Sequence, residues 1–248
     1  PLRLALEVRA GWELGALFAT APLLALAPRG DGHPVLVLPR LLGCDISTEP
    51  LRRSLDAIGY AAHPWGLGIN TGPRRGVLER CRDCIDRLHK THGRTVSLVG
   101  WSAGGLYARE LAKQAPHAVR CVISLGAPID GDPKPAELWR IYQQMTGEPM
   151  GMPETHGPLS EPPPVPSTAI VSRSDGIVPW PGANEPDGPL TETIEIESSH
   201  MGLAMHPLAI HAIADRLAQP EGQWQPFSRD GLKAWLYADP ARASRFPW

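Results

Sequence analysis

From residue 33 onward, short apolar runs alternate with stretches of helical periodicity. Continuous apolar runs predict strands that are covered on both faces of a sheet. Strands separated by helices predict βαβ units, and right-handed crossovers then bring the carboxyl ends of all strands to one edge. We therefore expect an α/β fold with a mostly parallel central sheet of about six strands, flanked by helices.

The expected strands span residues 35–38, 60–63, 95–99, 119–125, 168–172 and 193–197. The last of them alternates polar and apolar residues, which is typical of a half-exposed strand at a sheet edge. Helices are expected near residues 48–58, 77–92, 102–115 and 207–217. Open parallel sheets bind ligands at the carboxyl ends of their strands, so we expect the functional site at that edge.

Composition narrows the class of function. The 248 residues are 42% hydrophobic and 20% charged, which is enough apolar material for a buried core. The chain has 24 Lys and Arg against 26 Asp and Glu, so no basic excess favours nucleic-acid binding. The four cysteines are too few for a disulfide framework. Cys81 and Cys84 fit apolar positions of a helix, and a redox or metal role for their C-x-x-C spacing is the alternative.

Residues 1–33 are expected to form an N-terminal helix, over residues 2–21, that packs on the core. Two Arg–Glu pairs stand at the helix-stabilising i,i+4 spacing, Arg3 with Glu7 and Arg9 with Glu13. The alternative is a helix that touches a membrane surface, which the scarcity of Lys and Arg on its polar face disfavours. No apolar run is long enough to span a bilayer, and we expect a cytoplasmic protein. The sequence begins at Pro1 rather than Met, which suggests a truncated N-terminus.

Residues 130–166 interrupt the alternation with a proline-rich stretch, and loops this long are usually functional or disordered. We expect a cap or lid inserted between the two parts of the core, 34–129 and 167–219; a flexible linker is the alternative. Its apolar side chains are expected to line an acyl pocket: Leu138, Trp139, Ile141 and Tyr142. The tail, 220–248, is expected to pack back on the core with Trp224, Trp235 and Trp248.

Gly100-Trp101-Ser102-Ala103-Gly104 is a G-x-S-x-G pattern between an expected strand and an expected helix. A nucleophile elbow requires that context, because the sharp turn holds the Ser102 hydroxyl above the sheet edge. Side chains at Gly100 and Gly104 would collide with the crossing strand and helix, and the helix N-terminus points at the serine. The alternative, a phosphate-binding turn, lacks the patterns G-x-G-x-x-G and G-K-[ST].

A serine nucleophile needs a base, and the base needs a carboxylate to orient it. Asp175 and His200 each follow an expected strand, in the chain order Ser, acid, His that such sheets use. His206 is the rival base, and Asp130 is the rival acid because it follows an earlier strand. We favour Asp175 because its Ser-Asp-Gly turn fixes the direction of the side chain.

Together these pieces resemble the α/β-hydrolases of the lipase and esterase branch, in order over residues 34–218. The matching segments are 35–38 with the loop that follows, 100–105, 174–179 and 199–202. The two strands with which that fold usually begins have no counterpart. The resemblance implies an oxyanion hole with two backbone N–H donors, Ala103 after the nucleophile and, by position, Leu41.

The loop that carries Leu41 departs from the family pattern. Lipases usually have His-Gly or Pro-Gly before the donor, whereas this chain has Pro39-Arg40-Leu41. Glycine adopts backbone angles that arginine avoids, so we expect Arg40 to misplace the second donor and Arg40→Gly to raise activity on neutral esters. For a substrate with its own carboxylate, we expect Arg40 to act as a clamp.

We therefore expect a carboxylic ester hydrolase (EC 3.1.1) that works through an acyl-enzyme and needs no metal or organic cofactor. Ser102 attacks the carbonyl, His200 transfers the proton and Asp175 orients the imidazole. The substrate is expected to be a small ester with an apolar acyl group, with Arg40 and Trp101 as further pocket residues. Two alternatives are an acyltransferase on the same fold and a binding protein whose oxyanion site is impaired. The oligomeric state does not follow from the sequence.

Overall fold

The computed structural model describes residues 6–19, 27–129 and 158–238. Its strands are β1 (Pro34–Leu38), β2 (Ala61–Pro64), β3 (Val96–Trp101), β4 (Val119–Leu125), β5 (Ser167–Val171) and β6 (Thr191–Glu195). They form one six-stranded sheet in the order β2-β1-β3-β4-β5-β6. Every neighbouring pair is parallel, so the expected α/β fold with a parallel sheet is confirmed.

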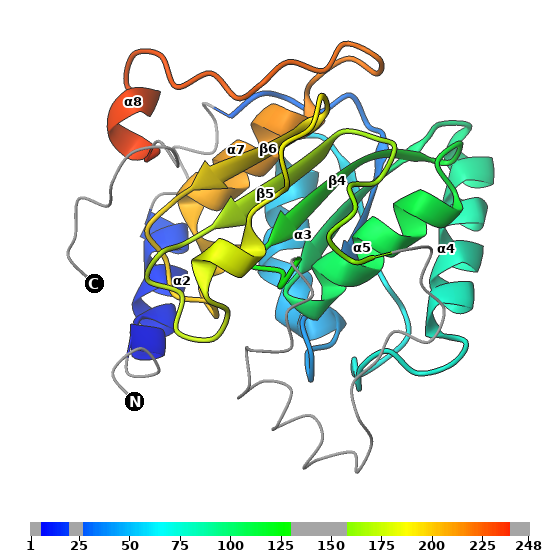
Figure 1. The fold of residues 1–248 in the computed structure, drawn as a ribbon, viewed down its shortest axis with the longest axis horizontal. Helices are drawn as coiled ribbons and strands as arrows, with labels where there is room; N and C mark the ends of the chain where they lie inside the picture. The colour runs from blue at the N-terminus through cyan, green and yellow to red at the C-terminus, as the bar shows by residue number, and fades with distance from the viewer. Residues whose placement is uncertain (1–5, 20–26, 130–157, 239–248) are drawn as a thin grey trace.

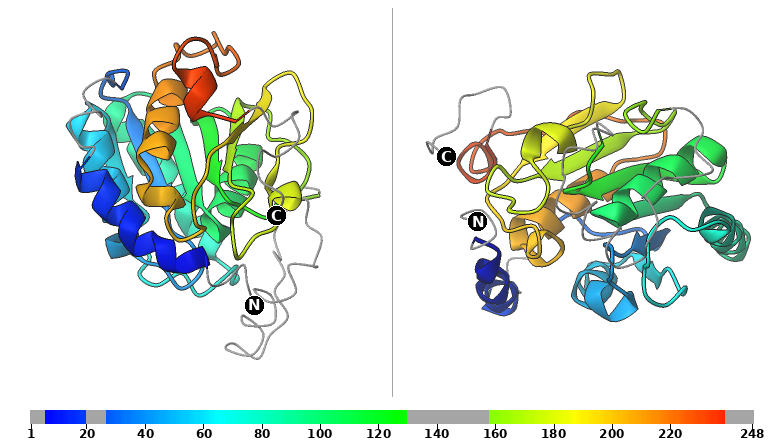
Figure 2. Two further views of the ribbon diagram at one scale, coloured as in Figure 1. Left: turned by 90° about the vertical axis from the view of Figure 1, so that its left-hand side faces the viewer. Right: turned by 60° about the horizontal axis from the view of Figure 1, so that its bottom comes forward.

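Helices cover both faces of this sheet (Figure 1). The α-helices are α2 (Ala10–Ala19), α3 (Glu49–Ala57), α4 (Val77–His92), α5 (Ala103–Gln114), α7 (Pro207–Leu217) and α8 (Lys233–Leu236). Short 3-10 turns are η1 (Leu6–Arg9), η3 (Asp45–Thr48), η4 (Trp180–Ala183) and η5 (Leu203–Met205). Figure 2 shows α2 beside α7 on one side of the sheet. No helix among the described residues is long and apolar enough to cross a membrane.

Strand β1 is apolar at successive residues, rather than at every second one, because both of its faces are buried. Val35 and Val37 pack into the apolar core that contains α3 and α7. Leu36 and Leu38 pack into a second core, with α4 and α5. Both faces of the strand are therefore covered, as its unbroken apolar run predicts.

Helix α4 contains the C-x-x-C pair as buried side chains of its inner face. Burial raises the pKa of the Cys81 thiol to about 12 and also raises that of Cys84. Both cysteines are free, and the described residues contain no group of three or more His, Cys, Asp or Glu that could hold a metal ion. The two thiols are core residues here, as helical periodicity predicts.

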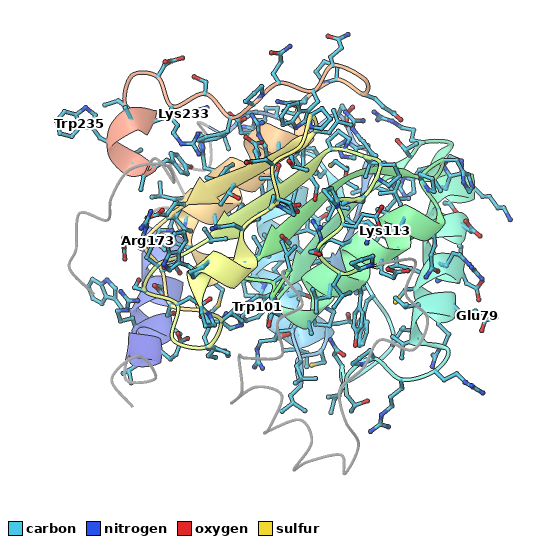
Figure 3. All side chains as sticks on the ribbon, viewed as in Figure 1. Glu79, Trp101, Lys113, Arg173, Lys233 and Trp235 are labelled. Carbon is cyan, nitrogen blue, oxygen red and sulfur yellow. The ribbon has the colours of Figure 1, made fainter. Side chains whose placement is uncertain are left out.

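The C-terminal tail packs on the core partly through residues other than those expected. Phe227 and Tyr237 are buried, and Ala238 forms an antiparallel bridge with Glu195 at the edge of β6. Trp235, in contrast, is 79% exposed and points away from α8 (Figure 3). The expectation that Trp235 packs on the core is therefore wrong, whereas Trp224 is half-buried. Trp248 lies outside the described residues.

Most of the expected cap, residues 130–157, also lies outside the described residues. The same holds for several residues named above: Arg3, the rival acid Asp130, and the acyl-pocket candidates Leu138, Trp139, Ile141 and Tyr142. The end of the segment is described, and there Arg109 of α5 donates to the carbonyl oxygens of residues 159–161. Arg109 is buried and pairs with Glu185, so the chain returns to the sheet at a fixed point.

Candidate active site

Ser102 stands between β3 and α5 in a strained backbone conformation, with φ 53° and ψ −119°. Its amide donates a 2.8 Å hydrogen bond to the carbonyl oxygen of Leu125, at the end of β4. A Cβ at Gly100 would collide with the backbone of Gly104, and a Cβ at Gly104 would collide with that of Leu38. Such strain costs about 1–3 kcal/mol and persists only where the surrounding structure enforces it. The turn has the geometry that the nucleophile-elbow pattern predicts.

Asp175 and His200 form a buried pair at the carboxyl ends of β5 and β6. His200 Nδ1 lies 2.6 Å from Asp175 Oδ2, and the side chains are each 2% exposed. The other carboxylate oxygen, Oδ1, accepts the amides of Ile177 and Val178 at 2.8 and 2.7 Å. One oxygen is thus fixed by the turn while the other orients the imidazole, so Nε2 is the ring nitrogen that faces away from the carboxylate.

The serine turn and the histidine loop are neighbours. Trp101 Nε1 donates a 3.1 Å hydrogen bond to the carbonyl oxygen of His200. A Cβ on Gly126, directly after β4, would lie 3.0 Å from Asp175 Oδ2 and 3.2 Å from His200 Nδ1. The described contacts do not include a hydrogen bond between Ser102 and His200. In ligand-free enzymes such bonds are often long and tighten when substrate binds.

The rival base, His206, has a structural task. Its Nδ1 accepts the amide of Leu208 at 3.2 Å, so the side chain caps the N-terminus of α7. Burial lowers the pKa of His206 and favours the neutral ring that such a cap requires. His200 is therefore the histidine that the fold brings to Asp175.

The loop after β1 carries the expected donor Leu41. Its left-handed backbone conformation is at a different residue from the one expected, Arg40. The left-handed residue is Leu42, with φ 59°, while Arg40 has no positive φ. The premise that position 40 needs a glycine-like backbone is therefore wrong, and the placement of the Leu41 donor stays a prediction. The Arg40 guanidinium donates to the Leu41 carbonyl at 2.9 Å and lies 5.3 Å above the ring of Trp101. Through these two contacts the Arg40 side chain links the loop to the serine turn. Its partial burial lowers the pKa of the guanidinium.

Comparison with known proteins identifies the family. Residues 21–148, slightly more than half of the 248, match the family model for the alpha/beta hydrolase fold. The chain belongs to the α/β-hydrolase family. It is also 32% identical over 108 residues to serine hydrolase BPHL of Mus musculus. That match covers 40% of this chain and 37% of the mouse protein.

Solved structures share the hydrolase fold at low identity. A monoacylglycerol lipase from Paleococcus ferrophilus is 15% identical with a TM-score of 0.53, over 75% of this chain and 96% of that one. Lipase B of Aspergillus fumigatus is 16% identical with a TM-score of 0.58, over 77% of this chain and 54% of the lipase. At these identities the likeness concerns the fold alone.

Asn70 is a residue of the hydrolase fold that sequence reasoning missed. Its buried side chain donates to the Pro39 carbonyl at 2.8 Å and accepts the Tyr107 hydroxyl at 3.1 Å. Its backbone accepts the Leu42 amide and donates to the Gly43 carbonyl, both at 2.7 Å. Asn70 therefore ties the Leu41 loop to α5, the helix that begins directly after Ser102. A lone Asn at the end of a glycine-rich loop is the only sequence signal for this role.

Two acidic residues of the N-terminal segment, Glu7 and Glu13, also reach the loops of Asp175 and His200. The sequence placed them in Arg–Glu pairs along the helix, so their contacts with the core were not expected.

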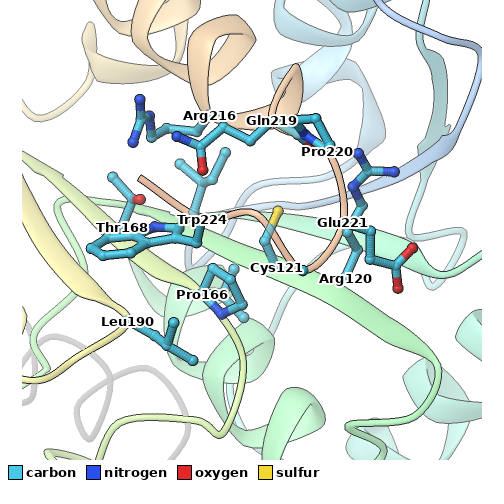
Figure 4. Close-up of a pocket in the computed structure, with 13 residues that line it drawn as sticks. Arg120, Cys121, Pro166, Thr168, Leu190, Arg216, Gln219, Pro220, Glu221 and Trp224 are labelled. Carbon is cyan, nitrogen blue, oxygen red and sulfur yellow. Dashed lines mark hydrogen bonds between the residues drawn. The ribbon is translucent and has the colours of Figure 1, made fainter. Parts of the chain in front are cut away.

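A cavity of about 330 Å³ lies at the opposite edge of this hydrolase sheet (Figure 4). Cys121 and Thr168, at the amino ends of β4 and β5, belong to its lining, together with Leu190 and Trp224. Ser102 follows the carboxyl end of β3, so this cavity is separate from the candidate active site.

Proposed function

We propose that this chain hydrolyses carboxylic esters through Ser102, His200 and Asp175. The observation that carries the proposal is the buried 2.6 Å contact between His200 Nδ1 and Asp175 Oδ2, next to a strained serine turn. That arrangement can raise the nucleophilicity of a serine hydroxyl and stabilise the imidazolium that forms.

In the proposed reaction the Ser102 oxygen attacks the ester carbonyl carbon, and its proton passes to His200 Nε2. The tetrahedral intermediate collapses, and the leaving alkoxide takes that proton and departs as the alcohol. Water then attacks the acyl-enzyme with His200 as base and releases the acid and free Ser102. Asp175 stays ionised throughout and holds Nδ1–H.

The amides of Ala103 and Leu41 are the proposed donors to the oxyanion. Ala103 is the first residue of α5, and the first amides of a helix have no acceptor within it. Leu41 is buried in the loop that Asn70 and Arg40 hold beside the serine turn. One oxyanion donor contributes about 3 kcal/mol to transition-state stabilisation.

An apolar acyl group is the proposed substrate preference. The Leu42 amide donates to the Asn70 carbonyl, so Leu42 and Ile69, the residue before Asn70, lie close together, and both side chains are exposed. They place apolar surface beside the proposed donor Leu41, where an acyl chain would leave water. Leu138 and Ile141 of the inserted segment remain predictions for the same pocket.

A fluorophosphonate probe and a panel of p-nitrophenyl esters of rising chain length test the proposal. Wild type should label at Ser102 and turn over the esters; Ser102→Ala should do neither, with a loss on the order of 10⁶ in kcat. Ser228→Ala, in the exposed tail, is the matched control. A wild type that is not labelled would favour a binding role, and products with added alcohol distinguish acyl transfer from hydrolysis.

The assignment of the acid has its own test. Asp175→Asn should lower kcat by about 10⁴, because the amide presents the wrong partner to the imidazole. Asp130→Asn should cost less than about tenfold if Asp130 takes no part in the triad. The reverse order of effects would move the acid to the segment after β4.

A further inference from the structure

Glu7, in η1 at the start of the chain, accepts three backbone amides from two distant loops. Its Oε1 accepts Gly176 N–H at 2.8 Å and His200 N–H at 3.0 Å. Its Oε2 accepts Met201 N–H at 2.9 Å. One carboxylate thus joins the residue after Asp175 to the backbone of His200 itself.

Glu13 and Arg9 extend this contact along the same segment. The buried Glu13 accepts Ser199 N–H at 2.8 Å and the Ser199 hydroxyl with its other oxygen. Arg9 donates to Ser174 Oγ at 3.1 Å. The N-terminal segment therefore binds residues on either side of Asp175 and of His200, and Figure 1 shows α2 at the ends of β5 and β6.

The charge of the Glu7 carboxylate strengthens these contacts. Hydrogen bonds from amides to a carboxylate are charge-assisted and roughly twice as strong as neutral ones. If the carboxylate were lost, three amides of the two loops would lose their acceptor, which is unfavourable where water has little access. His200 is held from both ends of its backbone, with its N–H on Glu7 and its carbonyl on Trp101.

We propose that η1 and α2 are a positioning element of the candidate active site. Glu7 and Glu13 fix the two loops relative to one another, and the contact between His200 and Asp175 depends on that docking. Neither glutamate touches the reacting atoms in this scheme. The family match begins at residue 21, so this element lies outside it. The expected effect of this element on turnover rests on the proposed ester hydrolysis. Its expected effect on the order of the two loops does not.

Hydrogen–deuterium exchange tests the ordering without any substrate. Glu7→Gln should speed exchange by about tenfold in peptides covering residues 174–178 and 198–203, and leave β3 and α5 unchanged. Val8→Ala is the matched control, because Val8 is the next residue of the same turn and is 84% exposed. Unchanged protection of both loops in Glu7→Gln would overturn the proposal. If Glu7→Gln does not fold, Glu13→Gln answers the same question through Ser199.

Turnover per active site tests the catalytic consequence. Fluorophosphonate titration counts competent sites, and kcat is then divided by that count. Glu7→Gln should keep the site count of wild type, lower kcat per site by about tenfold and change KM by less than about twofold. A loss confined to the site count would mean that the helix only stabilises the fold, which overturns the positioning role. If wild type neither labels nor turns over esters, ester hydrolysis is wrong, and the exchange experiment still decides the docking proposal.

Discussion

The indole N–H of Trp101 donates a 3.1 Å hydrogen bond to the carbonyl oxygen of His200. Trp101 is the residue before Ser102, so this bond connects the serine turn directly to the histidine loop. The face of the same ring carries the guanidinium of Arg40 at 5.3 Å. Three segments that each contribute to the candidate site therefore meet on one side chain, that of Trp101.

Trp101→Phe should lower both stability and turnover. Phenylalanine keeps an aromatic face for Arg40 but leaves the buried carbonyl of His200 without this donor, at a cost of about 1–3 kcal/mol in the free energy of unfolding. Urea unfolding and kcat on a p-nitrophenyl ester measure the two effects. Trp235→Phe, at an exposed position, should change neither. Equal effects from both substitutions would show that the hydrogen bond has no special weight.

Arg40→Gly should lower activity on neutral esters, contrary to the expectation from sequence. The substitution removes the hydrogen bond to the Leu41 carbonyl and the contact with Trp101, and it loosens the loop that presents the Leu41 amide. We expect kcat/KM to fall by about tenfold, since a donor that is displaced loses part of its contribution of about 3 kcal/mol. Assays with a neutral ester and with a carboxylate-bearing analogue check this. A gain on the neutral ester would restore the idea that Arg40 is a defect.

Asn70→Ala should destabilise the fold and slow turnover together. It removes the donor to the buried Pro39 carbonyl, at a cost of about 1–3 kcal/mol, and it also removes the hydrogen bond that the Tyr107 hydroxyl donates to the Asn70 side chain. Tyr107→Phe removes only the second bond and serves as the comparison. Thermal unfolding and kcat should rank wild type first, Tyr107→Phe second and Asn70→Ala last. If Asn70→Ala and Tyr107→Phe behave alike, the tie to the Pro39 loop contributes nothing.

Stability should decrease as the pH falls below about 6.5, partly because of His33. Burial lowers the pKa of this imidazole, an effect that its hydrogen bond to Asp31 offsets only in part and that Arg120 and Arg94 reinforce. Its Nε2 lies 3.0 Å from Ser97 Oγ, which suits a neutral ring. Below pH 6.5 the unfolded chain binds a proton here that the folded chain does not bind until its lower pKa is reached. The contribution is therefore present above pH 6.5 and is lost as the pH falls toward the folded pKa.

Urea unfolding at pH 7.5, 6.5 and 5.5 measures this dependence. One proton changes the free energy of unfolding by at most about 1.4 kcal/mol per pH unit. His33→Gln should flatten the slope between pH 6.5 and 5.5, whereas His117→Gln, at an exposed position, should leave it unchanged. An equal slope in wild type and His33→Gln would assign the pH dependence to other groups.

Local patterns in the sequence predict most of the fold. The expected bounds of β4 and α7 match the structure. The apolar run of β4 and the proline in the first turn of α7 are local signals, which can be read from adjacent residues alone. Parallel topology alone then brings the ends of β3, β5 and β6 to one edge, which is why Ser102, Asp175 and His200 could be named together. Their catalytic roles stay proposals.

The supporting residues could not be predicted in this way. Asn70 and Glu7 act on backbone groups of segments that are remote in sequence, and such contacts leave no periodic pattern. The conformation of the Leu41 loop was misjudged for the same reason. Its left-handed residue is Leu42, at the point where Asn70 accepts the amide, so a partner outside the loop sets its shape.

The contact between Glu7 and Met201 spans 194 residues of chain. During synthesis Glu7 is made before the whole sheet, whereas Gly176 follows β5, and His200 and Met201 follow β6. Contacts of such long sequence separation form late, because the intervening chain must first be ordered. The N-terminal helix therefore cannot complete its contacts until both loops have been synthesised, and the histidine loop receives this support only after β6.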